Sequence, residues 1–250
     1  MSASIEIIPV AGIGEVREGD EVGRLVAEVA PGLSDTEVVV VSQKIVSKAE
    51  GRVRALADVE PRGWASELAR ELGKDPRVVE LVLGEAARVV RAERGVLIVE
   101  TRSGLVCANA GIDSSNVPGD ERVTLLPADP DASARRIRSE IAAATGARPA
   151  VVVADSFGRP WRIGQVDVAI GCAGLAPVDD WRGRVDRDRR ELSATAIAVA
   201  DEAAAAADLA RDKVSGTPVA RLRGLDRFVT AEDGPGAAAL RRAEAEDLFR

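Results

Sequence analysis

The sequence predicts an α+β or irregular α/β fold, with mixed sheets and helices packed against them. Short β-branched runs, such as residues 37–41 and 151–153, alternate with segments whose apolar residues recur at helical spacing. The alternation lacks a regular strand–helix–strand rhythm, which argues against a doubly wound parallel sheet. Hydrophobic residues make up 46% of the chain and charged residues 30%, as in ordinary globular proteins. We expect the 250 residues to form a single domain, or two subdomains of one.

Each expected element follows from a local pattern. Aliphatic and β-branched runs bounded by Gly, Pro or polar residues predict strands, and residues 95–108 read as a hairpin around Ser103 and Gly104. The expected strands cover residues 5–8, 37–41, 95–100, 105–108, 123–126, a run that begins near 151, 166–172 and 218–222. Helical spacing of apolar residues predicts helices at 21–30, 62–72, 76–92, 131–144 and 191–210. The charged run 182–190 predicts a solvated surface loop.

Charge and composition exclude several classes of function. A net charge of −7 and a pI near 5.0 argue against nucleic acid as a partner, because binding to a phosphate backbone needs a basic face. No apolar run approaches the roughly 20 residues that span a bilayer, and the N-terminus lacks the features of a secretory signal. A cytoplasmic protein without a membrane partner is therefore expected. Cys107 and Cys172 lie in apolar stretches, so we interpret them as small buried residues.

The absence of histidine and tyrosine narrows the chemistry further. It excludes Ser-His-Asp and Cys-His nucleophilic machinery, His-ligated zinc and any histidine base. The groups that remain for catalysis are carboxylates, Lys, Arg, hydroxyls, backbone amides and a hard cation. This set suits phosphoryl transfer, in which positioning and charge neutralisation provide most of the catalysis.

Residues 151–175 carry the strongest functional pattern in the chain. An apolar strand leads into Asp155 and Ser156, and Arg159 and Arg162 follow within a few residues. Carboxylate and hydroxyl oxygens are suitable ligands for Mg²⁺ or Mn²⁺, and guanidinium groups bind phosphate oxygens. The alternative is an ordinary strand exit whose polar residues face water, with the arginines in surface salt bridges. Asp113 is the natural second carboxylate for a cation, unless it only caps its own turn.

Three further segments are candidate phosphate cradles. The Walker A motif is absent, and Gly12-Ile13-Gly14 does not begin a Rossmann fingerprint because Arg17 occupies the third glycine position. Residues 12–16, 42–48 and 109–116 each follow a predicted strand and are interpreted as loops with free backbone amides. Turns also need Gly, Asn and Ser for backbone reasons alone. The chain has only four lysines, at 44, 48, 74 and 213, and two of them fall in the second segment.

Three segments resemble the coenzyme F420:L-glutamate ligase family, the gamma-glutamyl ligases of deazaflavin biosynthesis. They are SQKIVSKAEGR at 42–52, ANAGIDSSNV at 108–117 and ADSFGRPWRIGQVDVAIGCAGL at 154–175, and the resemblance extends over essentially the whole chain. It implies that L-glutamate is added to the deazaflavin phospholactate precursor with GTP and Mg²⁺ or Mn²⁺, with K⁺ as a further candidate ion. It also implies an acyl-phosphate intermediate, release of GDP and phosphate, gamma linkage in later additions, and an unusual α/β fold that forms an intertwined homodimer.

The resemblance assigns roles to individual residues. Asp113, Asp155 and Ser156 match the divalent-metal positions, and we expect Asp155, Arg159 and Arg162 to act in catalysis. The positions that match GTP contacts are Gly12, Ile13, Gly14, Glu15, Val16, Ser42, Gln43, Lys48, Asn116, Lys213, Ser215 and Gly216. Many relatives have serine where this chain has Gln43. Some relatives continue into a nitroreductase-like domain, which we do not expect within these 250 residues.

Other functions remain open at this point. The acceptor could be a different glutamylated cofactor, such as a folate-like molecule, because acceptor choice depends on the shape of the pocket. A metal-dependent phosphatase could use Asp113 and Asp155 without ligation, and a non-catalytic subunit could bind the nucleotide alone. Dependence of nucleotide turnover on glutamate separates a ligase from a phosphatase.

Overall fold

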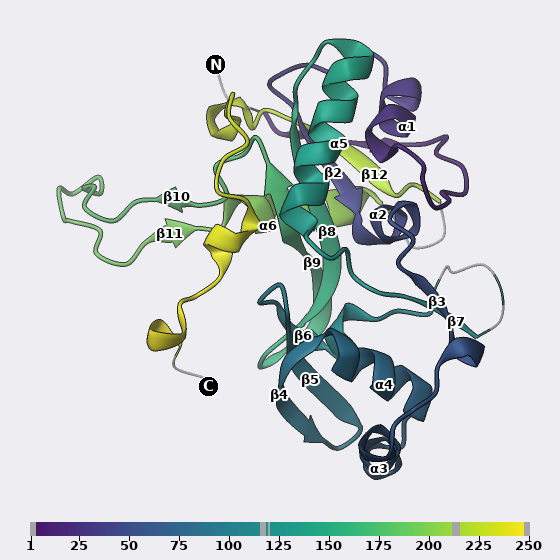
Figure 1. The fold of residues 1–250 in the computed structure, drawn as a ribbon. Coiled ribbons are helices and arrows are strands. Elements are labelled where there is room, and N and C mark those ends of the chain that lie inside the picture. Colours follow the sequence, from purple (N-terminus) through teal and green to yellow (C-terminus); the bar gives the residue numbers. More distant parts are fainter. Residues whose placement is uncertain (1–3, 116–118, 120, 212–215, 248–250) are drawn as a thin grey trace.

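The computed structural model describes residues 4–115, 119, 121–211 and 216–247. Its body is a mixed sheet with helices on both faces, and a second lobe built from residues 63–111 lies beside one end of that sheet (Figure 1). A narrow arm projects from the body. The α+β architecture with mixed sheets that the sequence predicts is confirmed.

Five strands of the described chain form the central sheet, in the order β1-β12-β2-β8-β9. Their bounds are β1 (Glu6–Val10), β12 (Val219–Arg223), β2 (Val38–Ser42), β8 (Ala150–Arg159) and β9 (Arg162–Ala173). β2 and β8 pair in parallel, whereas the other three neighbouring pairs are antiparallel. The first and last strands of the chain therefore lie side by side, which brings residues near 12 and 216 close to the same edge of the sheet.

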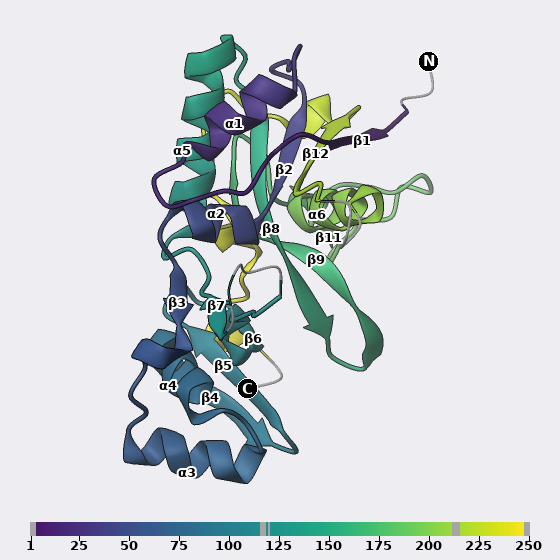
Figure 2. The ribbon, with the colours of Figure 1, turned by 90° about the vertical axis from the view of Figure 1, so that its right-hand side faces the viewer.

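Strand alternation divides the sheet into two buried faces. Val39, Val41 and their partners on β8 contribute to one core, and Val38, Val40 and Val152 contribute to the other. Helices cover both faces of the sheet (Figure 2). The first face carries α1 (Val22–Val29), α2 (Gln43–Ala49) and α5 (Pro130–Thr145), and the second carries α6 (Val199–Ala210).

The second lobe has its own core. The helices α3 (Gly63–Leu72) and α4 (Pro76–Glu85) pack against an antiparallel sheet of β4 (Ala86–Glu93), β5 (Val96–Thr101) and β6 (Val106–Ala108). Two short strands, β3 (Val53–Ala55) and β7 (Arg122–Thr124), pair at the junction with the body. The chain enters and leaves the lobe through these strands, so they set its position beside the central sheet.

The predicted helix at 76–92 is wrong in its second half. The helix ends at Glu85, and residues 86–93 form β4, which pairs with β5. Val89 and Val90 are β-branched, which favours a strand, and pairing of β4 with β5 replaces the backbone hydrogen bonds of a longer helix, with an irregularity between Val89 and Arg91. The expected hairpin between 95 and 108 is confirmed as β5 and β6.

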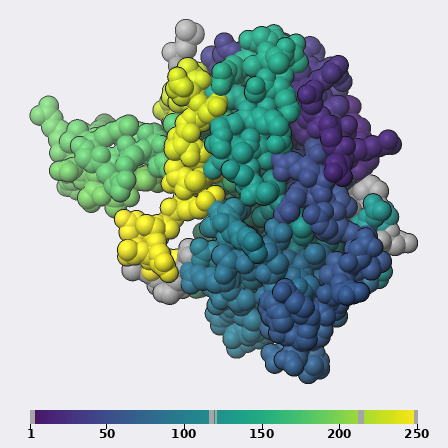
Figure 3. Space-filling view, in the orientation of Figure 1, coloured from purple at the N-terminus to yellow at the C-terminus, as the bar shows by residue number. Residues whose placement is uncertain are grey.

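The predicted helix at 191–210 is also too long. The helix α6 starts at Val199, and residues 196–197 form β11 (Ala196–Ile197), paired with β10 (Asp179–Asp180). These two strands form the base of the arm, drawn in green, which projects from the body in Figure 3. The charged run 182–190 lies mostly exposed at the end of this arm, as predicted. Pairing with β10 across the arm overrides the helical propensity of this segment.

The remaining expected strands and helices occur within a few residues of their predicted places. Cys107 and Cys172 are unpaired and buried, and burial raises the pKa of each thiol to about 12, which fits packing rather than reactivity. No helix among the described residues combines the length and apolar character that crossing a membrane requires.

Candidate functional site

A large cleft lies between the central sheet and the second lobe, with a volume of about 1500 Å³. Separate stretches of the chain line it: residues 13–16, Ser42 and the start of α2, parts of β4 and β5, residues 106–115, the β8–β9 hairpin, and residues 208, 211 and 216–218. Pockets for one small ligand usually measure about 300–1,000 Å³. The cleft is therefore large enough to hold more than one substrate at a time.

Most of the predicted site residues meet in this cleft. Those that line it are Ile13, Gly14, Glu15, Val16, Ser42, Gln43, Lys48, Asp113, Asp155, Ser156, Arg159 and Gly216. Gly12 is not among the lining residues, and neither is Arg162, which is exposed at the start of β9. Asn116, Lys213 and Ser215 lie outside the described residues. The tertiary structure thus brings residues from all four predicted segments, 12–16, 42–48, 109–116 and 151–175, into one cleft.

The segment 42–48 is a helix, which corrects its interpretation as a loop. Strand β2 ends at Ser42, and the seven-residue α2 begins at once. The Gln43 amide donates to Ser47 Oγ at 2.5 Å and to the carbonyl of Leu125 at 3.3 Å, so its nitrogen is occupied inside the protein. Lys44 and Lys48 are four residues apart, so they lie on the same side of α2 and both line the cleft.

Both lysines hold carboxylates in place. Lys48 Nζ lies 2.6 Å from Glu15 Oε1, and Lys44 Nζ lies 2.7 Å from Asp113 Oδ2. Lys44 also donates to the carbonyl and the hydroxyl of Ser115 at 2.7 Å. Sequence reasoning left Lys44 out of the site, although its rarity as one of four lysines was a usable signal.

Asp113 caps its own turn and also pairs with Lys44, while its role as a cation ligand stays a prediction. Its Oδ1 accepts the backbone N–H of Ser115 at 2.7 Å, which caps its turn, while Oδ2 accepts from Lys44. Burial would raise the pKa of Asp113, but the hydrogen bonds from Lys44 and Ser115 outweigh burial and lower it. Asp113 is therefore a carboxylate that stays ionised at the edge of the cleft.

A left-handed turn leads the chain to Asp113. Asn109, Ala110 and Gly111, which form the short helix η2 (Asn109–Gly111), have φ values of 51°, 53° and 69°. A side chain at Gly111 would meet Leu126 at 2.7 Å, so the close approach requires glycine. Two consecutive non-glycine residues in this region cost free energy, and such strain is concentrated at functional sites.

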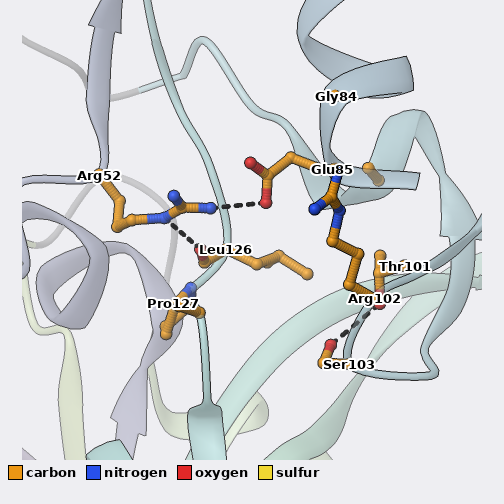
Figure 4. A pocket seen from close by; sticks show the side chains of 10 residues that line it. Arg52, Gly84, Glu85, Thr101, Arg102, Ser103, Leu126 and Pro127 are labelled. Atoms are coloured by element: carbon orange, nitrogen blue, oxygen red, sulfur yellow. Dashed lines mark hydrogen bonds and ion pairs between the residues drawn. The ribbon is translucent and has the colours of Figure 1, made fainter. Parts of the chain in front are cut away.

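A smaller pocket of about 290 Å³ has Ala110 of this turn among its lining residues. Figure 4 shows Arg52, Glu85 and Leu126 around it. Arg52 crosses it, donating to Glu85 at 2.6 Å and to the carbonyl of Leu126 at 2.9 Å. These bonds join the end of α4 to the chain that follows β7. The Arg52 guanidinium therefore serves to connect the two lobes.

Asp155 and Ser156 lie within strand β8, not in a loop after it, which corrects the expectation from sequence. The strand continues to Arg159 and turns directly into β9. Burial raises the pKa of Asp155 to about 7, and the nearby carboxylates of Asp167 and Asp113 act in the same direction. A backbone hydrogen bond from Ser156 and the charge of Lys44 only partly offset these effects on the pKa of Asp155.

Asp167 and Arg211 belong to the site but were missed by sequence reasoning. Asp167 is the cross-strand partner of Ser156; its Oδ1 accepts from Ser156 Oγ at 2.6 Å, and its Oδ2 lies 2.6 Å from Arg211. Arg211 also donates to the carbonyl of Pro218 at 3.2 Å. Only the register of β8 and β9, which is shifted between Val153 and Ala154, aligns these groups.

The donor set fits a hard divalent cation that shares its coordination with other ligands. Across the described ranges no group of three or more His, Cys, Asp or Glu side chains is arranged to hold a metal by itself. Asp113, Asp155 and the Ser156 hydroxyl supply a few oxygen donors, and Mg²⁺ is commonly held by one or two carboxylates plus water and substrate phosphates. A bound cation would favour the carboxylate form of Asp155 and so lower its raised pKa.

Comparison with known proteins identifies the family. The family described as F420-0:gamma-glutamyl ligase matches residues 12–224. The chain is 42% identical to the coenzyme F420:L-glutamate ligase of Methanothermobacter thermautotrophicus, over 98% of this chain and 99% of the relative. It is 42% identical to the protein of the same name from Methanopyrus kandleri, over 99% and 98%, and 44% identical to that from Haloarcula marismortui, over 98% and 96%. The resemblance that the motifs indicate is confirmed: the chain belongs to the F420-0:gamma-glutamyl ligase family.

Proposed function

We propose that this protein is a GTP-dependent ligase that joins L-glutamate to the coenzyme F420 precursor, with gamma linkage in later additions. The printed names of its relatives support the ligase activity and the two substrates. The observation that carries the proposal is the meeting of Lys44, Lys48, Asp113 and Asp155 in one large cleft. These residues come from three distant segments, and together they suit a metal-bound polyphosphate.

The reaction proceeds in two displacements. A carboxylate oxygen of the precursor attacks the γ-phosphorus of GTP, and the bond to the GDP oxygen breaks to give an acyl phosphate. The amine of glutamate then attacks the acyl carbon, inorganic phosphate leaves, and the amine loses its proton. Precursor, nucleotide and glutamate must meet for this chemistry, which the volume of the cleft allows.

Different residues of the cleft bind the triphosphate, the metal ion and the transferring phosphoryl group. Lys48, now 2.6 Å from Glu15, and Lys44 carry the positive charge that a triphosphate needs on this acidic protein. Asp113, Asp155 and Ser156 would hold Mg²⁺ or Mn²⁺, which neutralises phosphate charge when it is bound; K⁺ is a further candidate ion. Arg159 lines the cleft and suits the transferring phosphoryl group. Arg162 does not line the cleft, and its role at the phosphoryl group stays a prediction.

The proposed assembly is a homodimer. The arm built on β10 and β11 projects from the body, and Val185 near its end is 60% exposed. An extended element of this kind can be exchanged between two copies of a chain. A dimer in which each arm packs against the other protomer would cover it.

The test is a mass-spectrometric assay with the deazaflavin precursor, L-glutamate, GTP and Mg²⁺ or Mn²⁺, in which GDP is followed in parallel. We expect a product heavier by glutamyl units, with one GDP released for each. GDP release that needs no glutamate would indicate a phosphatase. A folate-like acceptor that reacts while the deazaflavin precursor does not would indicate a ligase of different specificity. GTP binding without any turnover would indicate a non-catalytic subunit.

A further inference from the structure

The tip of the β8–β9 hairpin presents an aromatic ring to the cleft. The hairpin extends beyond the central sheet toward the second lobe (Figure 2). Trp161 lies at its turn, is 82% exposed and lines the cleft. Its φ of 59° is in the left-handed region, which a bulky side chain rarely adopts. An indole held outward at the mouth of a binding cleft indicates a ligand that covers it.

Apolar side chains of the second lobe line the same cleft. Val90 of β4, Ile98 of β5 and Val106 of β6 belong to its wall, and Val90 and Val106 are each 37% exposed. Phe157 of the hairpin adds a further apolar surface. The lining therefore has two characters: charged groups from α2 and β8, and an apolar surface from the small sheet and the hairpin.

An arginine in the hairpin adds positive charge to this apolar region. Arg159 donates from a terminal nitrogen to the carbonyl of Ile163 at 2.8 Å, which fixes its side chain across the turn. Its buried Nε has no hydrogen-bond partner within the part of the chain that the structure describes. Buried polar groups are normally paired, so this nitrogen indicates a missing acceptor.

We propose that the ring system of the acceptor stacks on Trp161, in the space between the hairpin tip and the β4–β6 sheet. The ligand class is a planar aromatic molecule with an anionic tail. Its ring meets the apolar surface, and its tail passes Arg159 toward Lys44 and Asp113. This inference rests on the proposed function for the identity of the acceptor, but the aromatic site itself follows from the cleft.

The experiment compares Trp161→Ala, Trp161→Phe and a control, Trp64→Ala. Trp64 is 48% exposed on α3, contacts Arg62 and does not line the cleft. For Trp161→Ala we expect the KM for the deazaflavin precursor to rise about 5- to 100-fold, as for the loss of one aromatic stacking contact. The kcat and the KM for GTP should stay within about twofold. Trp161→Phe should recover most of the loss, and Trp64→Ala should behave as the wild type.

A second probe separates this inference from the proposed function. Flavin mononucleotide is planar, aromatic and anionic, and its fluorescence reports binding to the whole protein. If the wild type glutamylates the precursor and Trp161→Ala leaves its KM unchanged, the site is wrong while the function stands. If the precursor does not react but the flavin binds and Trp161→Ala weakens that binding, the function is wrong while the site stands. If light scattering shows that Trp161→Ala dissociates a dimer without changing either affinity, the indole belongs to an interface and the proposal falls.

Discussion

The buried pair of Asp167 and Arg211 gives the sharpest test of how this site is built. The two side chains are 7% and 6% exposed, and their closest atoms are 2.6 Å apart. Burial lowers the pKa of Arg211, while Asp167 and the nearby Asp208 oppose that effect. Replacing Asp167 by alanine leaves a buried guanidinium without its carboxylate, and also removes the acceptor of the Ser156 hydroxyl.

The expected loss follows from the burial of both partners. Removing one member of a buried ion pair costs about 3–5 kcal/mol, because the remaining charge stays desolvated. Asp208 supplies part of the missing charge, so we expect the lower end, about 3 kcal/mol. For a domain of 150–250 residues, about 2–4 °C of Tm corresponds to 1 kcal/mol, which gives a decrease of about 6–12 °C.

Urea unfolding followed by circular dichroism measures this free energy directly. Asp167→Asn keeps an acceptor for Ser156 without the charge, so it separates the hydrogen bond from the ion pair. The double variant Asp167→Leu, Arg211→Met removes both charges and should recover most of the lost stability. A loss below about 1 kcal/mol for Asp167→Ala, or no recovery in the double variant, would show that the pair does not organise this part of the cleft.

Three further predictions concern the cleft and the edge of the sheet. Asp155→Ala should lower metal-dependent turnover about 100-fold or more and weaken Mn²⁺ binding measured by calorimetry, because a direct oxygen donor is lost. Lys48→Ala should raise the KM for GTP about 10- to 100-fold in the GDP-release assay, since a charge-assisted hydrogen bond contributes about 1.5–3 kcal/mol. Burial would raise the pKa of Glu37, but hydrogen bonds from Arg223 and Arg221 outweigh burial and lower the pKa below its ordinary 4.5. Ionised Glu37 should therefore stabilise the fold fully above pH 4.5, and this contribution should disappear as the pH falls through the lowered pKa. Acid unfolding of Glu37→Gln should lack this pH dependence.

Each of these predictions has a control. Asp155→Ala should keep the wild-type circular dichroism spectrum, and turnover near the wild-type rate would remove it from the metal site. Lys74→Ala, a lysine outside the cleft lining, should leave the KM for GTP unchanged, so an equal effect of both variants would argue against Lys48. Identical acid unfolding of the wild type and Glu37→Gln would show that the Arg221 pair does not stabilise the sheet edge.

The sequence predicted elements best where pattern and environment agree. Strand β2 and the first half of β8 contain runs of buried valines, and such β-branched runs are typical of strands inside a sheet. Residues 86–92 and 191–198 were assigned to helices because the apolar residues around them recur at helical spacing. Residues 86–93 form β4 instead, which pairs with the adjacent β5, and residues 196–197 form β11, which pairs with β10.

The sequence by itself determined the chemistry that this protein can use. The absence of histidine, the scarcity of lysine, and the segments around Lys48, Asp113 and Asp155 are properties of the chain in any conformation. The tertiary structure alone decided which of these groups meet. The strand register pairs Ser156 with Asp167, and the end of α6 brings Arg211 to the same carboxylate. These contacts join residues 11 and 44 apart in the sequence, and local patterns do not encode the strand register or the helix packing that brings them together.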